Sequence, residues 1–238
     1  MSRSGLASRY RGLLIALAFN VVQGAALALL VDQPRAYALT WAALQPIGWM
    51  VQSYMVWEIF SLWTERYPGI GVFGRWLLVW FSVIAIAGGA AIGWRSYSWL
   101  EWAKSMRAIY VLRSAATFAL ATFLLLTIYF FRYLFRPSAA RNLVRHTWIS
   151  LAIFLALGFR LLLFGSRAAS VVALQFALLV LWLVCHLAWL IGLVPAGERV
   201  WTSDRNQLDE EAIARVDSQI TEGLRSLGVV RRLRSWLW

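Results

Sequence analysis

The sequence predicts an all-α, polytopic membrane helix bundle with six transmembrane helices, both termini cytoplasmic, and a C-terminal cytoplasmic amphipathic helix. Of its 238 residues, 61% are hydrophobic and only 14% are charged, whereas charged residues make up roughly a quarter of ordinary soluble domains. The apolar residues form blocks close to or longer than the ~20 residues that cross a bilayer as a helix. Basic residues lie at the ends of these blocks, where membrane proteins carry them.

We assign the six apolar blocks as spans, in chain order. They cover residues of about 12–31, 36–63, 76–94, 108–131, 147–165 and 168–194. The first block has a basic start that is typical of a signal peptide. It is longer than the ~7–15 residues of a signal core, so we expect an uncleaved first helix. Pro46 lies within the second block and predicts a kink or tilt there.

The distribution of basic residues favours both termini in the cytoplasm, by the positive-inside rule. With six spans, the inner segments hold 16 of the 23 basic residues and the outer loops hold 5. The loop 132–146 carries four arginines and no acid. A short multi-pass chain with arginine-weighted loops is typical of a bacterial inner (plasma) membrane, and we expect that location.

The charge composition of the chain changes near Gly197. This change predicts a membrane domain of residues 1–197 and a cytoplasmic tail of residues 198–238. The tail has a formal charge of zero, so the first 197 residues hold the whole net charge of +12. Apolar residues at helical spacing predict an amphipathic helix at about 206–227. This helix either packs under the chain's own inner loops or docks a protein partner. The last segment has the composition of one that lies on anionic lipid. Its candidate membrane-surface residues are Arg231, Arg232, Arg234, Trp236 and Trp238.

Two glycines in the third span, Gly89 and Gly93, have the G-x-x-x-G spacing that lets another helix approach closely. Packing inside the bundle is the simpler interpretation. A homodimer face is the alternative, so a homo-oligomer stays open.

The sequence contains no catalytic constellation, and we expect no enzyme activity, no metal and no cofactor. One cysteine and two histidines without spaced carboxylates do not make a metal site within one chain. There is no phosphate-binding glycine loop. The only lysine, Lys104, lies in a predicted outer loop, which excludes a retinal Schiff base within a span. The positive charge belongs to membrane loops, so nucleic acid is not an expected partner. A membrane-embedded enzyme is the least favoured class.

Four residues near the outer half of the bundle are candidate ligand- or lipid-binding residues: Arg160, Arg113, Gln175 and Asp32. Both arginines lie ~7–8 Å below the outer ends of their spans, at ~1.5 Å per residue. Because helical side chains lean toward the helix N-terminus, Arg113 can reach the outer headgroups, whereas Arg160 leans toward the membrane centre. A charge there costs at least ~2.5–3.5 kcal/mol. Arg160 therefore needs a partner, which is Gln175, Asp32, a backbone carbonyl or an anionic ligand.

Other polar residues also fall within the predicted spans. They are Asn20, Gln23, Gln45, Gln52 and Glu58.

These features favour a non-enzymatic integral inner-membrane protein that acts as a sensing, regulatory or assembly module, with the cytoplasmic tail as docking element. The alternative is a small transporter or channel that binds an anionic or amphipathic solute or lipid in the outer half of the bundle. The absence of a convincing repeat between residues 12–94 and 108–194 counts against that alternative. The expected partners are the lipid bilayer, an anionic lipid and a protein bound through the tail helix.

Overall fold

The structure, a computed structural model, describes residues 6, 8–94, 102–134, 140–163, 169–198 and 204–226. Within these ranges it contains seven α-helices and no strand, so the all-α prediction is confirmed for this part of the chain. The α-helices are α2 (Arg11–Ala28), α3 (Pro34–Trp63), α4 (Pro68–Trp94), α5 (Trp102–Ile128), α6 (Arg141–Leu162), α7 (Ala169–Gly192) and α8 (Asp204–Ser226). A π-helical turn, η1 (Tyr129–Leu134), continues α5, and a 3-10 turn, η2 (Pro195–Glu198), follows α7.

Five of these helices are long and apolar enough to cross a membrane. They are α2, α4, α5, α6 and α7. The helix α3 is the longest, at 30 residues, or about 45 Å at ~1.5 Å per residue. Its tryptophans, glutamines and Pro46 interrupt its apolar residues, and no stretch of α3 is as apolar as the candidate spans in the other five helices. The structure therefore supports a helical membrane protein, while the sixth span stays a prediction.

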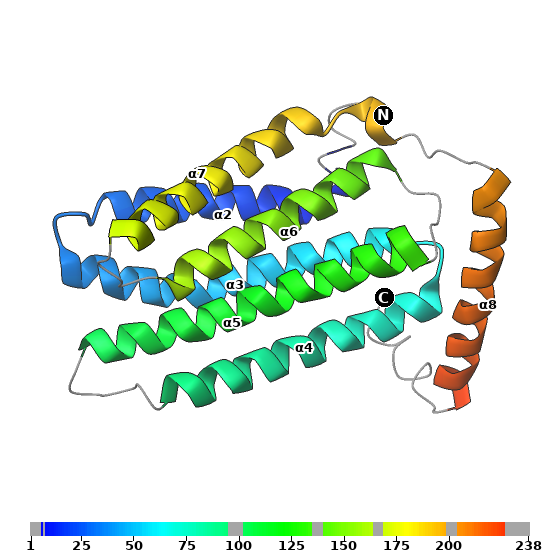
Figure 1. The fold of residues 1–238 in the computed structure, drawn as a ribbon, viewed down its shortest axis with the longest axis horizontal. Coiled ribbons are helices and arrows are strands. Elements are labelled where there is room, and N and C mark those ends of the chain that lie inside the picture. The colour runs from blue at the N-terminus through cyan, green and yellow to red at the C-terminus, as the bar shows by residue number, and fades with distance from the viewer. Residues whose placement is uncertain are drawn as a thin grey trace.

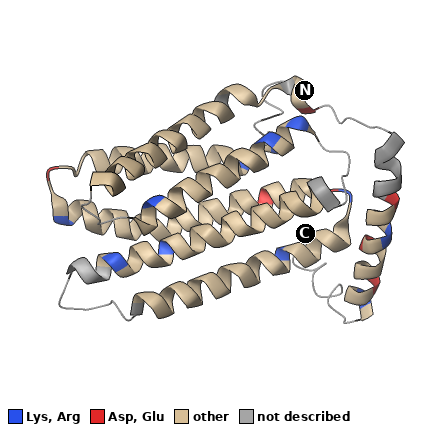
Figure 2. Ribbon diagram, in the orientation of Figure 1, with Lys and Arg blue, Asp and Glu red and all other residues tan. Residues whose placement is uncertain are grey.

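The helices α2 to α7 lie side by side along the long axis of the molecule, and α8 crosses one end of them (Figure 1). The centre of the bundle is formed by α5 and α6, each of which has more than half of its apolar stretch buried. Most of α2, α4 and α7 is exposed, with bare apolar side chains such as Val21, Trp80 and Phe176. Charged residues lie mostly toward the helix ends and on α8 (Figure 2). An apolar surface of this extent indicates membrane association.

Three helices begin earlier than the sequence predicts. The helix α5 begins at Trp102 rather than at about residue 108. The helix α4 begins at Pro68 rather than at about residue 76. Proline is favoured at the first position of a helix, because the N–H that it lacks would have no partner within the helix there. Arg75 then lies within the helix, with its guanidinium carbon 5.1 Å from the centre of the Trp57 ring. The helix α6 begins at Arg141 rather than at about residue 147. In all three cases, basic residues that lie within the helix precede the start that the sequence predicts.

The predicted tail helix is present as α8, and it packs against the start of α4. Ile213 is fully buried there. The Asp217 carboxylate oxygen Oδ1 accepts a hydrogen bond of 2.8 Å from the backbone N–H of Ile70. The first N–H groups of a helix have no partner within it, so Asp217 caps α4 from another helix. The predicted membrane-surface residues from Arg231 to Trp238 lie outside the described residues.

Gly89 and Gly93 of α4 both face α5 of the same chain. A Cβ added at Gly89 would lie 3.1 Å from the Leu112 Cα atom, and one at Gly93 would lie 3.3 Å from the Ala108 Cβ atom. The small residues thus allow the close approach of α4 and α5, which is the simpler of the two predicted interpretations. A homodimer remains untested.

Candidate ligand-binding cavity

A cavity of about 270 Å³ lies among five helices, α2, α3, α5, α6 and α7. Its walls combine polar side chains with aromatic and aliphatic ones. The lining residues are Phe19, Asn20, Gln23, Gly24, Leu27, Tyr37, Trp41, Gln45, Gly48, Gln52, Tyr110, Arg113, Leu157, Arg160, Leu161 and Trp182. Both predicted span arginines are among them, on α5 and on α6.

Arg113 is buried, with only 6% of its surface exposed. Its Nε donates to the Gln45 side-chain oxygen at 3.2 Å, and its Nη2 donates to the Gln52 side-chain oxygen at 2.5 Å. Its Nη1 is also buried but has no hydrogen-bond partner among the described residues. A buried donor without a partner is costly. The Nη1 amino group of Arg113 is therefore available to an acceptor.

The helix α3 presents both glutamines to Arg113. Gln45 and Gln52 are seven residues apart, or about two helical turns, so they share one face of α3. The Gln45 amide nitrogen donates to the Trp41 carbonyl at 3.0 Å, which turns its oxygen toward Arg113. Gly48 lies between the two glutamines, and a Cβ added there would lie 3.5 Å from the Arg113 Nη2 atom. The face thus combines two acceptors with room for a guanidinium.

Arg160 lies in the last turn of α6 and lines the same cavity. It is half-buried, and within the described ranges it forms no hydrogen bond or ion pair. The cavity lining contains no aspartate or glutamate. Two arginines therefore share a confined, partly apolar space without a carboxylate from the described residues, which is a favourable electrostatic environment for an anion.

The other two predicted residues lie elsewhere. The Gln175 amide nitrogen of α7 donates to the Leu163 carbonyl, so this side chain binds the end of α6 and not Arg160. Asp32 is exposed in the turn between α2 and α3 and does not line the cavity. The structure thus places Arg113 and Arg160 in one cavity. Neither proposed side-chain partner of Arg160, Gln175 or Asp32, lines that cavity.

Four neutral polar residues of the predicted spans also line the cavity, and each is weakly marked in the sequence: Asn20, Gln23, Gln45 and Gln52. Each is a neutral polar residue within a predicted apolar span, and such residues commonly serve ordinary helix packing. The one specific signal is the seven-residue spacing of the glutamines, which places them on one face. Nothing in the sequence indicates that this face meets Arg113.

At the wall of the cavity, Asn20 contacts a histidine of α7. The Asn20 amide nitrogen lies 3.3 Å from the His186 Nε2 atom, and His186 Nδ1 lies 2.8 Å from the Trp182 carbonyl oxygen. Because a carbonyl oxygen only accepts, Nδ1 carries the proton and Nε2 accepts from Asn20. His186 is therefore neutral, with both ring nitrogens in use.

A row of aromatic rings continues from His186 toward the end of the bundle where α8 lies. His186 contacts Trp189, Trp189 contacts His146, and His146 contacts Tyr10, with ring centres 5.2–5.3 Å apart. His146 is completely buried, and neither of its ring nitrogens has a hydrogen-bond partner in the described part of the chain. The row packs α6 and α7 and the residue before α2 together, between the cavity and the end of the bundle where α8 lies.

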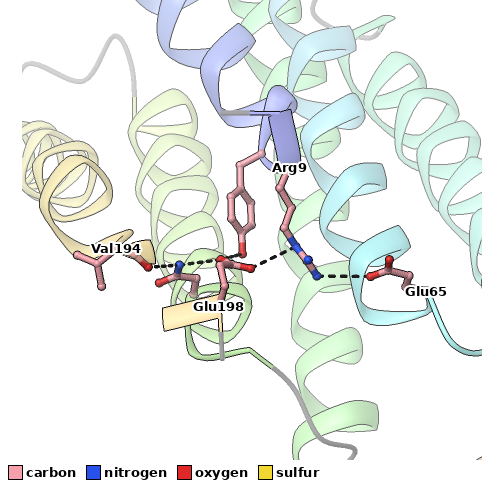
Figure 3. Close-up of polar contacts among 6 residues, drawn as sticks. Arg9, Glu65, Val194 and Glu198 are labelled. Carbon is pink, nitrogen blue, oxygen red and sulfur yellow. Dashed lines mark hydrogen bonds and ion pairs between the residues drawn. The ribbon is translucent and has the colours of Figure 1, made fainter. Parts of the chain in front are cut away.

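At that end, a polar network joins four separate segments (Figure 3). Glu198 of η2 accepts hydrogen bonds from the Tyr10 hydroxyl at 2.8 Å and from the Asn142 amide at 2.7 Å. Arg9 lies 3.2 Å from Glu198 and 3.4 Å from Glu65. Burial and the neighbouring Glu198 carboxylate raise the pKa of Tyr10 above its ordinary value, which keeps its hydroxyl protonated as a donor. The network fixes the segment before α2 to the segment after α7.

Comparison with known proteins adds no family to this description. No family model, curated protein or solved structure matches the chain. Among the described residues, no group of three His, Cys, Asp or Glu side chains could hold a metal ion. The fold and cavity define the class: a helical protein with five helices long and apolar enough to span a membrane and with two arginines in a cavity between its helices.

Proposed function

We propose that this protein binds a small anionic, partly apolar solute or lipid in the cavity between its helices, and that it acts as a transporter or channel for that ligand. The observation that carries the proposal is the shared location of Arg113 and Arg160 in a cavity whose lining contains no acid. The unpartnered Nη1 of Arg113 adds a donor at the site. A carboxylate or a phosphate is the acceptor that a guanidinium binds best.

The cavity walls restrict the ligand further. A volume of about 270 Å³ equals that of about nine water molecules in the liquid, which suits a small ligand or a single headgroup. Aromatic and aliphatic side chains, including Phe19, Trp41 and Leu157, form much of the wall. An anion that carries an apolar group therefore fits better than a small inorganic ion.

The contact between Arg9 and Glu198 supports six spans. Arg9 precedes α2 and Glu198 follows α7, and their side chains lie 3.2 Å apart at one end of the bundle. A chain that returns to the same side of a membrane has crossed it an even number of times. The six helices α2 to α7 satisfy this condition only if α3 also crosses. The excess of basic residues at this end then favours a cytoplasmic location for it, in the inner membrane of a bacterium.

The rival proposal, a sensing or assembly module that docks a partner through its tail, has less support. The apolar face of α8 is turned to its own bundle, with Ile213 fully buried and Val216, Ile220 and Leu224 half-buried. The side of α8 open to a partner is mainly polar. Helix-in-groove recognition uses an apolar face, which α8 already buries.

Binding can be tested with the purified full chain in lipid nanodiscs. Octanoate and hexyl phosphate serve as anionic probes, and octanol serves as the uncharged control. A ligand that binds the folded state raises its thermal stability. We expect both anions to do so and octanol to fail.

Arg113→Gln and Arg160→Gln should each weaken the affinity by about 2–5 kcal/mol, because each removes a charged partner of the bound anion. Arg107→Gln is the matched control, since Arg107 is exposed on α5 and does not line the cavity. Equal stabilisation by octanol and octanoate, or unchanged affinity in both cavity variants, would contradict the proposal. Uptake of labelled octanoate into proteoliposomes then separates a transporter from a protein that only binds.

A further inference from the structure

A second hollow lies on the outside of the bundle, between α3 and α4. It has a volume of about 400 Å³ and is almost entirely apolar. The lining residues are Trp49, Met50, Ser53, Tyr54, Trp57, Leu78, Val79, Ser82, Val83 and Ile86. We call this the α3–α4 groove. Met50, Tyr54, Val79 and Val83 in its walls are exposed, so the groove is open to the surroundings of the bundle.

The groove exists because α4 packs mainly on α5 and not on its hairpin partner α3. Gly89 and Gly93 bring α4 close to α5, with a Leu112 backbone atom 3.1 Å from the position of a Gly89 Cβ. The lining residues span nine positions on each helix, 49–57 on α3 and 78–86 on α4. At ~1.5 Å per residue, the groove follows the helix axes for about 12 Å. A groove of this shape can hold an extended hydrocarbon chain.

One cation lies next to the groove. The Arg75 guanidinium on α4 is held over the ring of Trp57, which itself lines the groove. Within the described ranges Arg75 forms no ion pair, and its buried Nε has no hydrogen-bond partner. A cation–π contact holds the guanidinium but does not satisfy its N–H donors. Arg75 thus presents unsatisfied donors beside an apolar groove.

The position of Arg75 suits a lipid headgroup. It lies about two turns from the start of α4 at Pro68, and side chains lean toward the start of their helix. Arg75 therefore points toward the end of the bundle where α8 lies. With the orientation given under Proposed function, that end faces the cytoplasmic leaflet, whose anionic lipids attract basic side chains.

From these features we propose that the α3–α4 groove binds one anionic phospholipid of the inner leaflet. The phosphate accepts hydrogen bonds from Arg75, and one acyl chain lies along the groove toward the bundle centre. The lipid supplies the acceptor that Arg75 lacks and covers apolar surface that α4 leaves open beside α3. Only the choice of leaflet rests on the proposed function. The site itself is separate from the cavity of Arg113 and Arg160.

The test is native mass spectrometry of the full chain, purified in mild detergent and titrated with phosphatidylglycerol or phosphatidylcholine. We expect wild-type protein to retain phosphatidylglycerol preferentially. Arg75→Gln should weaken that binding about tenfold, since it replaces a charged donor by a neutral one. Val83→Trp, on an exposed wall of the groove, should displace the chain with Arg75 still present.

Arg145→Gln is the matched control. Arg145 is exposed at the same end of the bundle, donates to the Gly192 carbonyl at 3.1 Å and lies outside the groove. Equal retention of both lipids by wild-type protein would overturn the proposal, as would unchanged phosphatidylglycerol binding in Arg75→Gln. A second copy of the chain over the groove would appear as a dimer that Val83→Trp dissociates, and it would also overturn the proposal. Octanoate binding in the cavity stays intact in Arg75→Gln whatever the outcome, so failure here is distinguishable from failure of the proposed function.

Discussion

At the scale of single residues, the two arginines of the cavity have different environments. Arg113 is held by two glutamine oxygens from α3, at 3.2 Å and 2.5 Å. Arg160 has no such partner within the described ranges and is half-buried. From helix direction alone, Arg113 is predicted to reach the outer headgroups and Arg160 is predicted to need a partner. The structure differs for Arg113, because Gln45 and Gln52 hold its guanidinium inside the bundle by hydrogen bonds.

The neutral character of Gln52 gives a direct test of charge in the cavity. Gln52→Glu keeps the size of the side chain and the acceptor for Arg113, but it neutralises the arginine. We expect the thermal stability of the unliganded protein to stay equal or to rise, and the affinity for octanoate to fall by at least about tenfold. Gln33→Glu, at the exposed start of α3, is the control. Octanoate affinity in Gln52→Glu equal to that of the wild type would show that the cavity does not select for negative charge.

At the scale of helices, the sequence predicts the elements well and their edges poorly. Each predicted span corresponds to a helix, because the apolar blocks are separated by short polar segments. The misplaced starts of α4 and α6 involve Arg75 and Arg145, which are charged residues inside helices. Arg75 is accommodated by the Trp57 ring, a partner about twenty positions away on another helix. No local pattern contains that information.

The contact of α8 with α4 is also tertiary, and one residue tests it. Ile213 of α8 is completely buried among the hydrophobic residues of the core, so Ile213→Asp places an unpaired carboxylate in apolar surroundings. Since burying such a charge is very unfavourable, we expect α8 to detach. Limited trypsin digestion should then cleave faster at Arg215 and Arg225. Ala214→Asp is the control, because Ala214 is exposed one position further on. Equal cleavage rates in the two variants would contradict this packing.

At the scale of the whole molecule, the functional hypothesis depends on which helix faces meet. The sequence places Arg113 and Arg160 at the same depth, and this part of the site could be predicted. It does not show that the glutamine face of α3 lies opposite Arg113, nor that Gln175 turns to the Leu163 carbonyl. The depth of a residue in the membrane follows from counting residues along its span. The helix that its side chain faces depends on how each of the six helices is rotated about its axis and packed. Apolar patterning is weak evidence for rotation when most of a helix surface contacts lipid.

The number of crossings is a property of the whole chain, and it can be measured. If α3 crosses the membrane, then six helices separate Arg9 from Glu198, and their contact at 3.2 Å places both on one side. We expect green fluorescent protein fused after residue 238 to fluoresce, because it folds in the cytoplasm. Alkaline phosphatase inserted between residues 95 and 101 should be active, since that loop is expected outside. A dark carboxyl-terminal fusion together with a fluorescent amino-terminal fusion would mean an odd number of crossings. Residues 9 and 198 would then lie on opposite sides, and the Arg9–Glu198 ion pair would not form within one chain.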